Sequence, residues 1–153
     1  MMKYLSQRDP KWATKKLGNT FLTVGRWGCT TTCVSMLSSL FGNVAYKDPG
    51  QLAADVQLYN AQGLILWAQI ARIFKGELSF VRRIQGMDRK AIAEGIAGDK
   101  TCVILEVANH SHWVVAHSPY GKDFYCIDPL DGKKKLALKT FGNITGSAHL
   151  TAK

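Results

Sequence analysis

Residues 28–37 read GCTTTCVSML, and they contain the clearest local signal in the chain, the start of a long helix. Small polar residues follow Gly28 and Cys29, and apolar residues then recur at helical spacing as far as Phe41. Three roles are open for Cys29. It is a nucleophile at a helix start, half of a metal or disulfide pair with Cys33, or a buried thiol. The rest of the sequence is needed to choose among them.

Helical periodicity continues through the first two-thirds of the chain. Asp48 is placed to cap a second helix, with Pro49 in its first turn. Gly76 ends a third helical segment. The predicted helices are residues 29–41, 48–60, 64–76 and 87–98.

Alternation of apolar and polar residues replaces the helical period in the second half. Strands are predicted at 77–84, 101–108, 112–118 and 123–129, a turn at 130–135 and a last strand at 134–141. Helices followed by strands indicate an α+β fold. We therefore expect one domain, residues 1–153, in which N-terminal helices pack on an antiparallel sheet built from residues after about 77.

Composition restricts the class of protein. The chain has 153 residues, of which 46% are hydrophobic and 20% charged, as in globular domains. The net charge is +9, but the basic residues are scattered and no nucleic-acid motif is present, so we expect no nucleic-acid partner. A basic surface would suit an anionic polymer such as bacterial cell wall. No apolar run reaches about 18 residues, so membrane insertion is not expected. We expect a monomer.

The N-terminal residues 1–16 have no apolar core of the kind that a signal peptide needs. We therefore expect a protein that is cytoplasmic as synthesised. Action outside a cell would require release by another route.

The four cysteines are expected to be free thiols, because no secretory signal accompanies them. Cys102 and Cys126 lie in strand-like segments and are predicted to be small buried hydrophobes. A zinc site is the alternative, and its ligands would be Cys29, Cys33, His110 and His112. The familiar knuckle spacings are absent, so we expect no metal and no cofactor.

A cysteine nucleophile needs a base and a group that orients the base. The dipole and free N–H groups at a helix start stabilise a thiolate at Cys29. His112 begins an apolar strand and Asp128 ends the next one, so antiparallel pairing would bring them together. His110 is a rival base outside the strand. Two histidines are predicted to lie at the surface or at an edge: His117 and His149.

Residues flanking the proposed Cys and His are candidates for a substrate cleft. Gly28 allows a sharp turn and leaves room for a substrate backbone. Trp27 precedes this glycine and Trp113 follows His112, so both tryptophans are predicted to line the cleft.

Four short motifs occur in the order seen in a known family. They are YLSQRDPKWA at 4–13, GCTTTCVSM at 28–36, HWVVA at 112–116 and IDP at 127–129. In these motifs the chain resembles family thirty-nine of the cysteine peptidases, the double-glycine leader peptidases, and most of all their stand-alone relatives. Thr30 and Thr31 replace the Gly-Pro that usually follows the family's cysteine, a departure that bears on the shape of the cleft.

The resemblance implies a papain-like fold, a Cys29–His112–Asp128 triad and Gln7 as a donor to the oxyanion. The implied function is a cysteine peptidase that hydrolyses a peptide or isopeptide bond. Its substrate would be a leader peptide, another protein or the stem peptide of peptidoglycan. The alternative is a papain-like domain that binds a partner with little or no activity.

Overall fold

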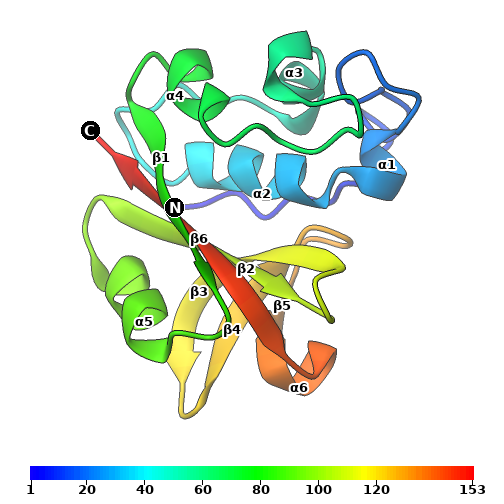
Figure 1. Cartoon of the computed structure of the whole chain (residues 1–153). Helices are drawn as coiled ribbons and strands as arrows, with labels where there is room; N and C mark the ends of the chain where they lie inside the picture. The colour runs from blue at the N-terminus through cyan, green and yellow to red at the C-terminus, as the bar shows by residue number, and fades with distance from the viewer.

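The computed structural model describes residues 1–153 and contains a six-stranded sheet flanked by short helices (Figure 1). The helices are α1 (Val24–Trp27), α2 (Cys29–Ser38), α3 (Pro49–Ala53), α4 (Gln69–Ile73), α5 (Arg89–Ala97) and α6 (Ala137–Phe141), with a 3-10 turn η1 (Val56–Leu58). The strands are β1 (Leu78–Gln85), β2 (Thr101–Val107), β3 (His112–Tyr120), β4 (Asp123–Asp128), β5 (Lys133–Leu136) and β6 (Ile144–Ala152). No helix has both the length and the apolar character needed to cross a bilayer.

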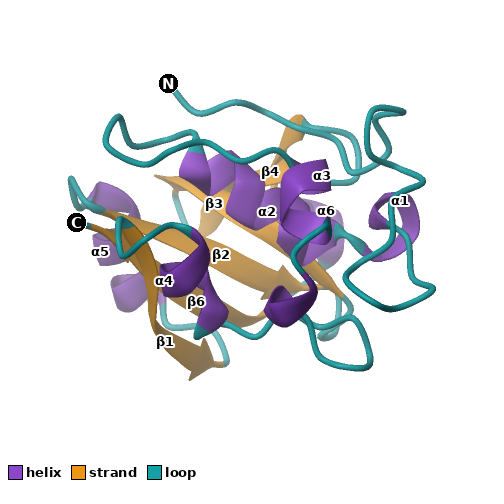
Figure 2. Cartoon of the chain, turned by 90° about the horizontal axis from the view of Figure 1, so that it is seen from above, coloured by secondary structure: helices purple, strands orange, loops and turns teal.

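All neighbouring strands run antiparallel, in the order β1-β6-β2-β3-β4-β5. Helices α1 to α4 lie on one side of the sheet, where α2 packs on β3 and α4 on β1, and α5 and α6 lie against the other face (Figures 1 and 2). The predicted α+β arrangement, with N-terminal helices on an antiparallel sheet formed after residue 77, is confirmed.

The alternating side chains of β2 show how the sheet separates two cores. Cys102 and Ile104 belong to the larger core, which lies beneath the N-terminal helices. Val103 and Leu105 belong to the smaller core, which faces α5 and α6. Glu106 falls on the same face as Ile104 by the two-residue period of a strand, so a carboxylate lies at the edge of the larger core.

Helix α2 begins at Cys29 as predicted but ends at Ser38 rather than at Phe41. The hydroxyl of Ser38 donates to the Ser35 carbonyl oxygen, and the hydroxyl of Ser39 donates to that of Met36. Such bonds compete with the helical backbone ladder and favour its termination.

The predicted helix 48–60 is divided in two. Asp48 and Gln51 form a reciprocal capping box at the start of α3. The Asp55 side chain then accepts from the N–H of Gln57 and starts η1. The next predicted helix, 64–76, is shortened to α4.

Strand β6 was not predicted from the sequence, yet it lies between β1 and β2. Its residues include Gly146, Ser147 and Ala148, which have weak strand propensity. They form a strand because both edges are paired and because small side chains fit there. A Cβ on Gly146 would come within 3.2 Å of the Glu106 carboxylate. The surface position predicted for His149 is also wrong, because this residue is buried in β6.

The strand predicted at 134–141 is wrong in its second half, which forms helix α6. The two carboxylate oxygens of Asp123 accept from the backbone N–H groups of Leu138 and Lys139. This cap comes from the start of β4, so the flanking sequence of α6 carries no sign of it. The predicted turn 130–135 is wrong at its end, where residues 133–135 pair with β4.

Candidate active site

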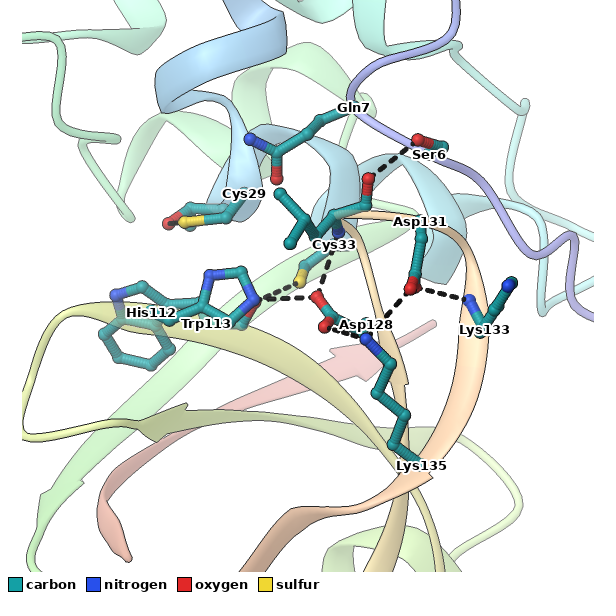
Figure 3. Close-up of polar contacts among 12 residues, drawn as sticks. Ser6, Gln7, Cys29, Cys33, His112, Trp113, Asp128, Asp131, Lys133 and Lys135 are labelled. Carbon is teal, nitrogen blue, oxygen red and sulfur yellow. Dashed lines mark hydrogen bonds and ion pairs between the residues drawn. The ribbon is translucent and has the colours of Figure 1, made fainter. Parts of the chain in front are cut away.

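Three polar residues meet where α2 crosses the end of the sheet (Figure 3). Cys29 is the first residue of α2, His112 is the first of β3 and Asp128 is the last of β4. Strands β3 and β4 pair with each other, and α2 packs on β3. Each side chain therefore stands at an element end, where the backbone is held in place.

The Asp128 carboxylate is buried and fully engaged. Its Oδ1 lies 2.7 Å from His112 Nε2 and accepts from the N–H of Leu130 at 2.9 Å. Its Oδ2 accepts from Lys135 Nζ at 2.7 Å. Burial alone would raise the pKa of Asp128, but the bonds from His112 and Lys135 outweigh it and lower the pKa to about 2.

The Cys29 thiol and the His112 imidazole change each other's pKa. Burial alone would raise the pKa of Cys29, yet the neighbouring His112 imidazole lowers it below the usual thiol value. Burial likewise opposes the imidazolium, but Asp128 and then Cys29 raise the pKa of His112 to about 9. The second ring nitrogen of His112 is turned toward Cys29 in Figure 3. This arrangement favours a thiolate–imidazolium pair.

The other three cysteines have the opposite character. Cys33, Cys102 and Cys126 are buried free thiols, as predicted for the last two. Burial raises the pKa of Cys102 and of Cys126 to about 12 and also raises that of Cys33. Cys29 is thus the one thiol that is both partly exposed and acidified.

The zinc alternative lacks site geometry, because no three His, Cys, Asp or Glu side chains are arranged to hold a metal ion. His110, the rival base, contacts Glu106 through Nδ1 at 2.7 Å.

Gln7 is brought to the site by the N-terminal segment. Its backbone N–H donates to the Pro129 carbonyl oxygen at 2.6 Å, just beyond Asp128. The side chain is buried beside Cys29 (Figure 3), where Nε2 donates one hydrogen to the Gly25 carbonyl oxygen at 3.1 Å. A second Nε2 hydrogen remains. The backbone N–H of Cys29 also has no acceptor in the structure, as is typical of the first turn of a helix.

A cleft borders Cys29. One pocket, of about 230 Å³, is lined by Trp27, Cys29, Thr30 and Trp113 among others. Trp27 is 53% exposed and forms an open wall.

One of the flanking residues acts differently from the sequence prediction. Gly28 is not among the residues that line the pocket at Cys29. A Cβ at this position would come within 2.5 Å of the Val24 carbonyl oxygen, so only glycine fits against α1 here. Its role in this structure is the close packing of α1 against α2. The hydroxyl of Thr31 is used internally, at 2.8 Å from the Tyr59 hydroxyl.

Sequence reasoning missed Lys135, Arg83 and Glu106. Lys135 bridges Asp128 and Asp131, the second at 2.9 Å. Of these three residues, Glu106 could have been identified from the sequence. It is a single acid within the apolar stretch TCVILEV, where a buried carboxylate requires partners.

Comparison with known proteins gives one informative likeness. No protein-family model matches the chain, and no curated protein matches it significantly. Among solved structures the chain is similar to a double glycine motif protease from an AMS/PCAT transporter, determined in complex with the leader peptide. The TM-score is 0.56 at 19% identity, over 82% of this chain and 84% of that one. A more distant likeness is to the Pseudomonas avirulence protein AvrPphB, with a TM-score of 0.40 at 13% identity, over 82% of this chain and 90% of that one.

The fold is therefore the α+β fold of papain-like cysteine peptidases, as the sequence resemblance implied.

Proposed function

We propose that this protein is a cysteine peptidase that hydrolyses a peptide or isopeptide bond with Cys29, His112 and Asp128. The observation that carries the proposal is the coupled set of charges, in which Asp128 raises the pKa of His112 and His112 lowers that of Cys29. A thiol in a binding module needs no such set, since nothing then depends on its ionisation.

In the proposed reaction the Cys29 thiolate attacks the carbonyl carbon and forms a tetrahedral oxyanion. The second hydrogen of Gln7 Nε2 and the free N–H of Cys29 are the donors for that oxygen. The C–N bond then breaks, and His112 gives its proton to the leaving amine. A water adds to the thioester while His112 takes its proton, which releases the acid and restores the ion pair. Asp128 keeps the ring oriented throughout.

The proposed substrates are a peptide awaiting processing or the stem peptide of peptidoglycan. The similar transporter protease was determined with a leader peptide, which supports a peptide substrate for this fold. The net charge of +9 suits an anionic polymer such as cell wall.

Selective alkylation tests the proposal most simply. Iodoacetamide at about pH 6, where ordinary thiols are protonated, should modify Cys29 alone in the native protein. His112→Ala should slow this modification strongly, whereas Cys33→Ala should not. Peptides and purified peptidoglycan, offered separately, should be cut by the wild-type protein and not by Cys29→Ala. Slow and unselective alkylation would favour the binding-module alternative.

A further inference from the structure

The cleft at Cys29 continues into a second pocket of about 420 Å³. Both pockets are lined by the same five residues: Thr30, Leu64, Ile65, His110 and Trp113. The second pocket adds Arg83 and Glu106, which come from β1 and β2. A peptide bound at Cys29 therefore has a polar compartment next to it.

Glu106 is the only acidic residue that lines either pocket, and both of its carboxylate oxygens already have partners. The side chain is 4% exposed. Oε2 accepts from Arg83 Nη2 at 2.7 Å. Oε1 lies 2.7 Å from His110 Nδ1 and accepts from the Thr145 hydroxyl at 3.0 Å. Glu106 thus acts as an anchor for cleft residues and leaves no free carboxylate oxygen for a cationic ligand.

Arg83, in contrast, keeps most of its donors free. A guanidinium has five N–H groups, and Glu106 is its only hydrogen-bond partner here. The side chain is 37% exposed, and the guanidinium lies over the Trp113 ring at 5.1 Å from the centroid. Glu106 and Trp113 therefore hold the guanidinium in one place, and its remaining N–H groups are available to a ligand.

A second residue with a free donor lines the same pocket. The Asn60 Oδ1 accepts from the backbone N–H groups of Gln62 and Leu64, while its Nδ2 has no partner. Arg83 and Asn60 thus have free N–H groups, while both oxygens of Glu106 already accept hydrogen bonds. The pocket is therefore complementary to a ligand group that accepts hydrogen bonds. A planar carboxylate matches a guanidinium with two parallel bonds, and the aromatic walls strengthen such bonds by excluding water.

We propose that this pocket, in the peptidase proposed above, selects substrates that carry a carboxylate close to the bond that is cut. Two sources share this chemistry. One is the side chain of an α-linked Asp or Glu, and the other is the free main-chain carboxylate of a γ-linked glutamyl residue. The Arg83–Glu106 pair has no net charge, so recognition depends on hydrogen-bond geometry at short range rather than on long-range attraction.

The experiment uses peptidyl acyloxymethyl ketones, whose ketone methylene forms a thioether with Cys29 as the carboxylate leaving group departs. Probes with α-linked Glu, γ-linked Glu and the matching amides, at successive positions before the ketone, are compared by their second-order rates of Cys29 modification. We expect an acid to react about tenfold faster than its amide at one position, since hydrogen bonds to charged groups are the stronger ones. The linkage of the faster acid identifies the source.

Variants connect that preference to the pocket. Arg83→Gln should abolish it, and Arg83→Lys should retain part of it, because lysine keeps the charge without the fork. Arg82→Gln is the matched control. Arg82 lines a separate pocket with His149, so the preference should remain.

Equal rates for acids and amides at every position in the wild-type protein would overturn the proposal. A preference that persists in folded Arg83→Gln would do the same. Should Arg83→Gln fail to fold, the wild-type comparison and Arg83→Lys still decide the question. Iodoacetamide is too small to use the pocket, so its rate reports on Cys29 alone. Selective iodoacetamide alkylation without a preference for acids would support the proposed peptidase activity and contradict only the proposed carboxylate specificity.

Discussion

Replacing Asp128 by Asn removes one negative charge at the centre of the site and keeps the shape of the side chain. The carboxylate lies 2.7 Å from His112 Nε2, is buried, and is held from the other side by Lys135. Asparagine has the same shape but no charge, and its amide N–H₂ in the Oδ2 position would face the Lys135 ammonium, donor against donor. Asp128→Asn therefore tests whether this charge sustains the Cys29–His112 ion pair.

The structure sets the size of the effect. The pKa of His112 lies at about 9 instead of 6.5, a difference that corresponds to about 3.4 kcal/mol in favour of the imidazolium. Burial opposes this rise, and Asp128 is the largest cause that favours it. A hydrogen bond to a charged group contributes about 1.5–3 kcal/mol, so Asp128→Asn should lower the pKa of His112 by about one to two. Less imidazolium means a higher pKa for Cys29.

Two measurements follow the change. An NMR titration of the His112 ring gives its pKa directly, and the iodoacetamide rate of Cys29 as a function of pH gives the thiolate population. At about pH 8, above or near the lowered pKa of His112, the imidazolium population should fall by up to about tenfold, and Cys29 should react more slowly in proportion to the lost thiolate. Asp131→Asn is the control, since Asp131 shares Lys135 but does not contact His112. An unchanged pKa for His112 in Asp128→Asn, with unchanged alkylation, would refute this reasoning.

Three further predictions concern the stability of the fold and the oxyanion donor. The depressed pKa of Asp128 contributes stability above the unfolded value of about 3.9, and this stability is lost as the pH falls through about 2. Lys135→Met should raise the pKa of Asp128 and lower the unfolding free energy at neutral pH by about 1–3 kcal/mol. The variant should then lose less stability on acidification than the wild-type protein, as urea titrations at several pH values would show. Leu150→Ala empties a fully buried site in β6 and should cost about 2–5 kcal/mol in the same assay, whereas a loss below about 1 kcal/mol would contradict the central position of β6. Gln7→Ala should reduce turnover of a cleaved substrate about 100-fold and leave thiol alkylation nearly unchanged; full turnover would remove Gln7 from the oxyanion site.

Local patterns predicted the start of α2 and the strands β2, β3 and β4. Their signals lie within the segments themselves, since apolar residues recur at the helical or strand period there. The positions of Cys29, His112 and Asp128 at element ends followed from the same patterns. The approach of His112 to Asp128 required only that two consecutive strands pair, which is the commonest arrangement for neighbours in a chain. Cys29 joins them because α2 packs on β3.

Helix α6 shows where local reading fails. Residues 134–141 alternate like a strand, but Asp123 caps Leu138 and Lys139 from a distant segment. The sequence prediction missed strand β6 for a different reason. Its small residues carry little strand signal, and they are suited to this position by the groups that pack around them. A Cβ on Gly146 would crowd the carboxylate of Glu106 on the neighbouring strand.

The periodicity of the chain is thus sufficient for the fold class and for placing Cys29, His112 and Asp128 at element ends, since each placement depends on residues close together in sequence. Their grouping as a triad was implied by the family resemblance. The chemistry around the triad is not readable in this way. Lys135 reaches Asp128 only after β5 pairs with β4, and Arg83 meets Glu106 across 23 positions and an intervening strand, β6. Buried charges obtain their pKa values and their partners from the groups that folding places beside them, and those neighbours exist only in the packed chain.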